Sequence, residues 1–319
     1  MRVAMSEDFA AATEGFRREL LAHCYRMVGS VDDAEDLVQE VYLRAWRGWG
    51  TFEGRASVRT WLYRIATNAC LSALQHRDRR YLPSGLGAPG EDPHAPLEFA
   101  APGTRWIQPI PADPADIVAE RDNLRLALIV SLQHLPPQQR AVLVLREVLA
   151  FSASEVAEML QLSVPAVKSS LQRARAKLAE LESDRDKITE PSDARAQELL
   201  DAYLAAFENS DAAALEKVLR GDLVLELTPS RTWFAGLRTC LPCLTDYALG
   251  SPGEWRMFPT RANGQPAAAA YRRTGEGVHE AYGIAVLTLA EDGIARITVF
   301  GDPGLLPVFG FPTEVPAGR

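Results

Sequence analysis

The sequence predicts a multidomain protein in which two all-α domains are followed by an α+β domain. Three observations support this fold class. Before Lys187, apolar residues recur at helical spacing. A stretch dense in proline and glycine, from 83 to 112, interrupts that pattern, and no regular structure is expected there. After Asp222, short runs of β-branched and aromatic residues are typical of strands.

The chain of 319 residues is long enough for two or three domains, each with a core of its own. We expect an all-α domain over 1–82, a linker over 83–112, a second all-α domain over 113–184, a short linker over 185–194 and the α+β domain over 195–313. No window reaches about 18 apolar residues, and the N-terminus MRVAMSEDF lacks the apolar core of a signal peptide. We therefore expect a cytoplasmic protein without a membrane segment.

Charge is distributed unevenly along the first domain. The net charge of −8 argues against a protein that simply coats DNA. Between Ser6 and Leu43 nine acidic residues accompany three basic ones, whereas between Arg44 and Arg80 eight arginines accompany two acidic residues. Two apolar stripes predict the helices that carry these charges: Leu37, Val38, Val41, Tyr42 and Ala45, then Val58, Trp61, Leu62, Ile65, Ala66 and Ala69. The sequence thus places a protein-docking surface beside a nucleic-acid-binding surface.

Aromatic residues are interleaved with the arginines of the basic half. They are Trp46, Trp49, Phe52, Trp61 and Tyr63, among Arg44, Arg47, Arg55, Arg59 and Arg64. This pattern is typical of proteins that stack on unpaired bases and hold single-stranded phosphates. Trp61 lies on an apolar stripe, so we expect it in an ordinary core position. Trp49 stands beside glycines, and we expect it to be exposed.

The segment 152–178, SASEVAEMLQLSVPAVKSSLQRARAKL, predicts a helix-turn-helix. Ser152 and Glu155 form a capping box for its first helix. Ser163 caps the second helix, and Pro165 is tolerated in the first turn of that helix. The second helix turns Val167, Leu171, Ala174 and Leu178 inward, and Lys168, Ser169, Gln172, Arg173 and Arg175 outward. Such side chains read base edges and hold phosphates, so we favour DNA binding over a hairpin with a merely solvated basic face.

The last third predicts two helices and then a strand meander. The helices cover 194–208 and 211–219, and the strands cover 224–227, 267–273, 282–290 and 294–300. Glu291-Asp292-Gly293 is a hairpin turn signal between the last two strands. Cys240 and Cys243 form a CxxC pair, which is typical of a redox pair or half a zinc site, but the sequence holds no second pair. We therefore expect two small buried side chains, and neither a metal nor a cofactor.

Two blocks resemble extracytoplasmic-function (ECF) sigma factors of RNA polymerase. The block 33–80, with DAEDLVQE and ASVRTWLYRIATN, resembles their region 2. The segment 113–181, in which LPPQQRAVLVLRE leads into the helix-turn-helix, resembles their region 4. The rest, with LLDAYLAAFENSDAAALEKVL, WFAG, NGQPAAAAYRR and ITVFGDPGLLPVFGFP, resembles the SnoaL-like, NTF2-like cone domain that a subgroup carries, and WIQPIP resembles the linker motif of that subgroup.

The resemblance implies a role for each block. Glu35, Asp36, Gln39 and Glu40 would dock on the β′ clamp helices of core RNA polymerase. Trp49, Phe52, Arg55, Arg59, Arg64 and Asn68 would bind the −10 element of promoter DNA. Region 4 would meet the β flap, and Ser163, Ala166, Lys168, Ser169, Gln172, Arg173 and Arg175 would bind the −35 element. Many relatives have Thr and Arg where this chain has Ala166 and Ser170, which leaves the −35 sequence open.

The resemblance implies a sigma factor that directs promoter-specific initiation, with the C-terminal domain modulating activity in cis. Trp106 and the segment 308–311 are candidate contacts for that control, because both place apolar groups in irregular segments. A helix-turn-helix regulator with a small-ligand-binding domain is the alternative. An enzyme is not expected, because the last domain has a single histidine, His279, which we expect in a surface loop. A separate anti-sigma factor stays open as a further partner.

Overall fold

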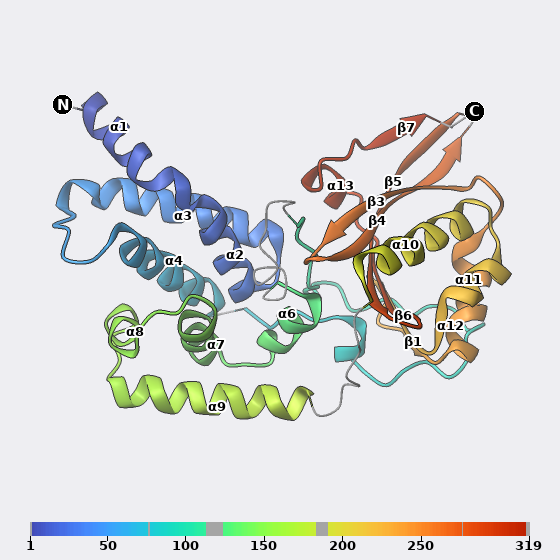
Figure 1. Cartoon of the computed structure of the whole chain (residues 1–319), viewed down its shortest axis with the longest axis horizontal. Coiled ribbons are helices and arrows are strands. Elements are labelled where there is room, and N and C mark those ends of the chain that lie inside the picture. The colour runs from blue at the N-terminus through green and yellow to red at the C-terminus, as the bar shows by residue number, and fades with distance from the viewer. Residues whose placement is uncertain (1, 76, 113–123, 183–190, 276, 317–319) are drawn as a thin grey trace. The chain divides into compact units, whose positions relative to one another are not determined.

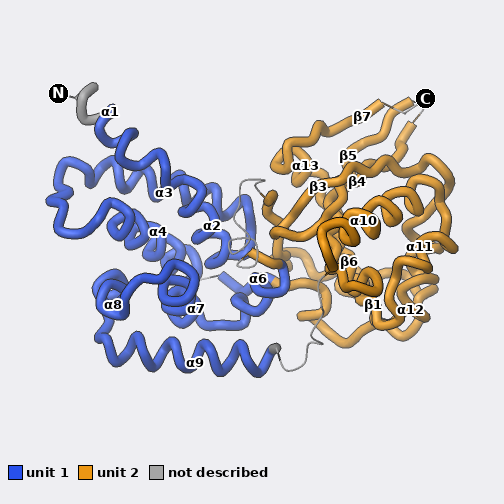
Figure 2. The backbone as a smooth tube through the Cα atoms, in the orientation of Figure 1, with its two compact units in different colours: residues 1–80, 126–186 blue, residues 81–125, 187–319 orange. Residues whose placement is uncertain are grey.

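The computed structural model describes residues 2–75, 77–112, 124–182, 191–275 and 277–316. They form two compact units: residues 1–80 with 126–186, and residues 81–125 with 187–319 (Figure 2). The described part of the first unit is built from helices, and the second unit carries the sheet (Figure 1). This arrangement confirms the predicted fold class. Among the described residues, no helix combines the length and apolar character that a membrane crossing requires.

The first unit begins with four helices whose ends follow from local sequence. They are α1 (Arg2–Thr13), α2 (Arg17–Val28), α3 (Val31–Gly48) and α4 (Val58–Leu74), with short turns η1 (Glu14–Phe16) and η2 (Trp49–Thr51). Gly29 ends α2 in the left-handed conformation, with φ of 71°. Ser30 caps α3 by accepting a hydrogen bond from the Asp33 amide at 3.2 Å, and Ser57 caps α4 through the Thr60 amide at 3.0 Å.

The second helical segment of this unit contains the predicted helix-turn-helix. Its elements are α6 (Leu126–Gln133), α7 (Pro137–Leu143), the π-helical turn η4 (Val144–Val148), α8 (Ala153–Leu160) and α9 (Val164–Glu182). The capping box of Ser152 and Glu155 is confirmed, since each side chain bonds the backbone amide of the other. Gln161 makes the turn in the left-handed region, with φ of 54°. The all-α domain expected over 113–184 shows its first described helix from Leu126 onwards; residues 113–123 lie outside the described part.

Both helical segments pack together within the first unit. The ring of Phe151, which precedes α8, meets Tyr63 of α4 edge-on with centroids 5.3 Å apart. The buried guanidinium of Arg140 on α7 donates to the carbonyl oxygen of Met27 at the end of α2. Gly29 lies against Gln133 of α6, because a Cβ added at Gly29 would come within 3.1 Å of the Gln133 side chain. The segments that resemble regions 2 and 4 therefore share one core.

The second unit is a curved sheet covered by helices. Its strands are β1 (Leu219–Thr228), β2 (Trp233–Ala235), β3 (Trp255–Ala262), β4 (Gln265–Gly275), β5 (Val278–Ala290), β6 (Gly293–Phe300) and β7 (Glu314–Pro316), in the order β2-β1-β6-β5-β4-β3, with β7 paired to β5. The β1–β6 pair is parallel and the other pairs are antiparallel. The helical elements are α10 (Asp193–Glu208), α11 (Ala212–Val218), α12 (Leu237–Cys243), α13 (Leu305–Val308), η3 (Pro83–Gly85) and the π-helical turn η5 (Leu244–Leu249). Side chains of α10 and α12 join those of the sheet in one hydrophobic core.

The linker 83–112 belongs to the second unit and lies along it. It contains little regular structure, as predicted, but its backbone bonds to the domain at several points. Gly90 donates to the Trp233 carbonyl oxygen at 2.7 Å, and the indole of Trp233 donates to Gly87 at 2.9 Å. Ile107 and Ile110 are buried, at 0% and 5% exposure. The linker is therefore a docked segment, and the compact units divide the chain differently from the predicted segments.

Two expectations about the second unit have clear outcomes. His279 lies on β5 and is 3% exposed, with Nε2 3.0 Å from the Gly253 carbonyl oxygen, so its placement in a surface loop was wrong. Cys240 and Cys243 are buried on α12, as predicted, and burial raises the pKa of both thiols to about 12. Among the residues described here, no cluster of three or more His, Cys, Asp or Glu side chains could hold a metal ion.

Candidate nucleic-acid interface

The acidic face of α3 combines free and paired carboxylates. Asp36 and Gln39 are exposed, and Leu43 on the following turn is 51% exposed. Residues at these spacings share one side of a helix. Glu35 pairs with Arg17 at 2.5 Å, and Glu40 pairs with Arg44 at 2.6 Å. This face is therefore a polar surface with one exposed apolar side chain, which suits docking on another protein.

The aromatic residues after α3 form one cluster. Trp49 is half-buried: its ring stacks on Phe52 with centroids 5.6 Å apart, and it lies 5.5 Å from Phe9 and 6.0 Å from Trp61. The expectation that Trp49 is exposed was wrong, because Phe9 of α1 covers it and no sequence pattern had placed that helix. Trp61 is 9% exposed, which confirms its core position. Trp46 joins the cluster through Phe9, at 5.3 Å.

Four polar residues complete the predicted −10 surface, and two of them, Arg55 and Arg64, line a groove together with Phe52 and Trp61 of the cluster. Arg64 and Asn68 are exposed on successive turns of α4. Arg55 is exposed and pairs with Glu53 at 2.5 Å. Arg59 is already engaged: Nε lies 3.3 Å from the Glu19 carboxylate, and its guanidinium lies over the Phe151 ring, 4.7 Å from the centroid.

A groove of about 310 Å³ separates this surface from α8. Phe52, Arg55 and Arg64 line one side of it, and Glu155 and Glu158 line the other. The Ser152 hydroxyl and amide hold the pKa of the Glu155 carboxyl below its usual range, so this group is charged at neutral pH. The carboxylates of Glu155 and Glu158 thus lie across the groove from Arg55 and Arg64, the arginines that are predicted to bind DNA phosphates.

The second helix of the helix-turn-helix presents a polar face. Ser163 caps α9 as predicted, accepting from the Ala166 amide at 3.3 Å, and Ala166 is half-buried. Lys168, Ser169, Gln172 and Arg173 are exposed, whereas Val167 and Ala174 are fully buried. Arg173 donates to the Ser169 hydroxyl at 2.7 Å. These placements agree with the inward and outward faces expected from the sequence.

Arg175 has an intramolecular partner that sequence reasoning missed. Its Nε donates to the Glu147 carboxylate at 2.8 Å. Glu147 lies in η4, and its distance along the chain from Arg175 hides this pairing in the sequence. The positive charge of Arg175 is therefore partly compensated, unlike that of exposed Lys168.

The comparisons with known proteins match this arrangement. The family model for sigma-70 region 2 matches residues 13–80, and the model for sigma-70 region 4 matches residues 125–178. The ECF RNA polymerase sigma factor SigG of Mycobacterium tuberculosis is 46% identical over 316 residues, covering 97% of this chain and 85% of that protein. The chain belongs to the ECF RNA polymerase sigma factors.

Other relatives support the assignment over parts of this sigma factor. SigW of Bacillus subtilis is 31% identical over 174 residues, which cover 53% of this chain and 86% of that protein. The crystal structure of SigJ of Mycobacterium tuberculosis matches with a TM-score of 0.62 and 22% identity, over 95% of this chain and 99% of that one. At this identity the likeness establishes the shared fold alone, in which an NTF2-like domain follows regions 2 and 4. The identity to SigG over nearly the whole chain sets aside the alternative of a helix-turn-helix regulator.

Proposed function

We propose that this sigma factor binds core RNA polymerase, directs it to specific promoters in the cytoplasm without enzymatic chemistry of its own, and is restrained in cis by its C-terminal domain. Proteins of the family bind core polymerase and promoter DNA. The exposed face of α3, with Asp36, Gln39 and Leu43, is the proposed contact with the β′ clamp helices, and region 4 is proposed to meet the β flap. Glu35 and Glu40 would exchange their partners Arg17 and Arg44 for polymerase groups on docking.

The promoter contacts divide between the two helical segments. Phe52, Arg55, Arg64 and Asn68 are proposed for the −10 element, with Trp49 stacked beneath Phe52 as its support. Arg59 would contact DNA once it leaves Phe151. The −35 contacts are proposed for Ser163, Ala166, Lys168, Ser169, Gln172, Arg173 and Arg175. Exposure of most of these side chains on the N-terminal half of α9 supports this assignment.

Promoter geometry requires regions 2 and 4 to separate. The −10 and −35 elements lie about 25 base pairs apart, which is about 85 Å of B-form DNA. In the first unit the two regions share a core, with Tyr63 and Phe151 in ring contact. In that state Arg59 is held against Phe151. The packed arrangement is therefore a resting state, and initiation requires it to open.

The docked linker limits how far the regions can separate, and this observation carries the proposed restraint. Tyr81 and Trp106 pair side by side: the Tyr81 amide donates to Arg105 at 2.9 Å, and the Ile107 amide donates to Tyr81 at 2.9 Å. Residues 82–105 therefore form a loop whose two ends meet, and this loop adds nothing to the distance that the linker can span. A chain of n residues spans at most about 3.3 Å per residue. Tyr81 is therefore separated from Ile110, the next residue that is bonded to the domain, only by the short stretch from Trp106 to Ile110.

The side chain of Asn263 is that anchor. Its Oδ1 accepts from the Ile110 amide at 3.2 Å, its Nδ2 donates to the Leu124 carbonyl at 2.7 Å, and its amide donates to Ile110 at 2.9 Å. Tyr81 and Leu124 lie near the two ends of the segment 81–125 that joins the helical parts of the first unit, and they are thus held within about 30 Å of each other. A released segment from 81 to 125 would reach about 150 Å when extended. Only the released linker spans the promoter elements.

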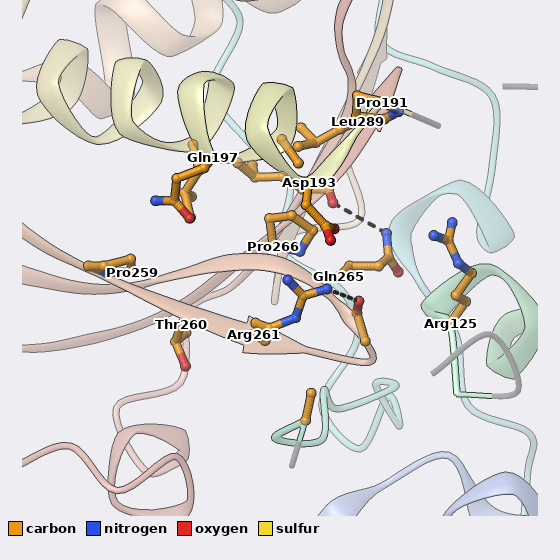
Figure 3. A pocket seen from close by; sticks show the side chains of 15 residues that line it. Arg125, Pro191, Asp193, Gln197, Pro259, Thr260, Arg261, Gln265, Pro266 and Leu289 are labelled. Atoms are coloured by element: carbon orange, nitrogen blue, oxygen red, sulfur yellow. Dashed lines mark hydrogen bonds between the residues drawn. The ribbon is translucent and has the colours of Figure 1, made fainter. Parts of the chain in front are cut away.

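The turn that carries this anchor is a tight hairpin held by side-chain hydrogen bonds. Asn263 and Gly264 connect β3 to β4, with φ of 53° and 70°, as in a two-residue hairpin turn. Arg261 donates to the Gly264 carbonyl oxygen at 2.8 Å, and Gln265 donates to the Thr288 hydroxyl at 3.0 Å. Arg261 and Gln265 also line a cavity of about 600 Å³ beside the turn (Figure 3). These bonds hold the turn in the geometry in which Asn263 bonds the backbone of Ile110 and Leu124.

Run-off transcription with purified core polymerase tests the proposal. The variant Asn263→Gly keeps the left-handed turn and removes both side-chain bonds to the linker. We expect promoter-dependent transcripts from the wild-type chain, and transcription several-fold higher from Asn263→Gly. The control Asn209→Ala loses only a local bond to the Ala205 carbonyl oxygen and should behave as wild type. No transcript with core, together with specific duplex binding without it, would refute the sigma function. Equal transcription from wild type and Asn263→Gly would refute the restraint alone.

A further inference from the structure

The second unit contains an apolar cavity of about 170 Å³ that the sigma function does not use. Strands β1 and β3–β6, helix α10 and the residues around η5 line it. The walls are mostly hydrocarbon and ring atoms, including Phe207, Trp255, Met257 and Val299. Two alanines of the sheet, Ala270 and Ala285, belong to the lining, and their small side chains leave space for the cavity. A larger side chain at either position would fill the cavity.

Most polar groups of the walls already have partners. The indole of Trp255 donates to the Ala248 carbonyl oxygen at 2.6 Å. The guanidinium of Arg272 pairs with Glu254, with Nε 2.8 Å from the carboxylate. The hydroxyl of Tyr247 donates to the His94 carbonyl oxygen at 2.6 Å. No uncompensated charge therefore faces the cavity from these groups.

Two phenols in the lining are exceptions. Tyr203 of α10 is 1% exposed, and Tyr282 of β5 is half-buried. Neither hydroxyl makes a hydrogen bond within the part of the chain that the structure describes. Burial raises the pKa of Tyr203, and the neighbouring Tyr282 adds to this effect. Burial also raises the pKa of Tyr282. Both groups therefore remain O–H donors at neutral pH, and both line the cavity, where a bound ligand could accept from them.

We propose that this cavity binds a neutral, single-ring aromatic compound whose carbonyl oxygen accepts a hydrogen bond from the Tyr203 hydroxyl. The volume matches this size, since a cavity of about 150 Å³ holds one benzene ring. The ring walls favour an aromatic ligand, and edge-to-face contacts with Trp255 and Phe207 would orient it. A charged ligand would enter without a compensating charge, which is unfavourable in such surroundings. A carbonyl oxygen would accept the hydrogen bond that the Tyr203 hydroxyl does not make among the described residues, and Tyr282 lines the same cavity as a second possible donor.

The linker completes the cavity. Leu97 and Phe99 belong to its lining, and Leu97 packs against the core of the domain. Backbone bonds hold this part of the linker on the segment after β1: the Arg231 amide donates to Glu98 at 2.8 Å, and the Ala100 amide donates to Pro229 at 3.3 Å. A ligand in the cavity therefore contacts the docked form of the linker.

Binding of two matched probes to the full-length chain tests the proposal. Acetophenone carries a ring and a carbonyl oxygen, and ethylbenzene has nearly the same shape without the oxygen. Ligand-observed NMR and calorimetry should show saturable binding of acetophenone, with affinity about tenfold above that of ethylbenzene, as one net hydrogen bond provides. Tyr203→Phe keeps the ring and removes the hydroxyl, so it should bring the two affinities together. Ala285→Leu should abolish binding of both probes.

Matched controls separate the site from general effects on folding. Tyr271→Phe removes a buried hydroxyl of the same sheet that donates to the Pro312 carbonyl oxygen, outside the cavity lining. It should leave the preference for acetophenone unchanged, and thermal unfolding should show that each variant is folded. Two results would overturn the proposal: no saturable binding of acetophenone, or the same preference for it in wild type and Tyr203→Phe.

Discussion

His23 shows how one buried side chain makes stability depend on pH. Its Nε2 lies 2.9 Å from the Thr67 hydroxyl, whose own hydrogen is donated to the Tyr63 carbonyl oxygen. The Nε2 atom must therefore carry the proton, and Nδ1 is left as a buried acceptor without a partner among the described residues. Burial, helped by the charge of Arg26, lowers the pKa of His23 to about 3.

Acid should therefore destabilise the first unit through this residue. Between pH 6.5 and pH 3 the unfolded chain binds a proton at His23 and the folded chain does not, so stability falls as pH falls. From pH 7 to pH 5 the expected loss in free energy of unfolding is about 2 kcal/mol. Urea unfolding of wild type and His23→Gln at pH 7 and pH 5 measures this loss. The free energy of unfolding of the variant should fall by about 2 kcal/mol less than that of wild type. Parallel pH dependence in the two proteins would contradict this assignment.

At the scale of elements, local chemistry determines which parts of the fold the sequence predicts. Ser152 and Ser163 allowed the starts of both helices of the helix-turn-helix to be predicted. Each serine caps a helix by accepting a hydrogen bond from the amide three residues later, and such a cap can be recognised from residue type and spacing alone. Strand β3 was not predicted, since Pro259 interrupts its pattern, and an edge strand tolerates proline. Its turn residues Asn263 and Gly264 were a signal that could have revealed it. The cover of Trp49 by Phe9 was not predictable, because it depends on tertiary packing.

The carboxylates of helix α8 lie beside the proposed −10 surface and should weaken its attraction for DNA phosphates. Glu158 lines the groove opposite Arg55 and Arg64 and is exposed to solvent. Glu158→Gln should raise the affinity of the free protein for single-stranded −10 DNA about two- to threefold at low salt, and less at high salt, because exposed charges are screened. Fluorescence anisotropy measures this. Glu180→Gln, at the far end of α9, is the control of equal charge change, and an equal effect from both would exclude a local screen.

For the whole molecule, the linker is where sequence reasoning was least complete. Its proline content predicted irregular backbone, and that is what the chain has. Its docking rests largely on backbone groups, such as the Ala112 amide that donates to Arg261 at 3.1 Å, and such bonds leave no trace in residue type. Glu226, fully buried on β1, accepts from the Ser84 amide at 3.0 Å and from Arg296 at 2.7 Å. This buried carboxylate is thus an anchor for the linker.

The cavity and the linker together predict that a small ligand controls initiation. A ligand that contacts Leu97 and Phe99 stabilises the docked linker, by about 2.7 kcal/mol at a concentration 100 times its dissociation constant. Because the docked linker cannot span the promoter elements, acetophenone should lower run-off transcription by the wild-type chain several-fold. Tyr203→Phe, which binds the probe more weakly, should need about tenfold more of it for the same effect. Ethylbenzene at the same concentration should act weakly. Inhibition that is equal in wild type and Tyr203→Phe would place the effect on polymerase itself, and the coupling between cavity and linker would be wrong.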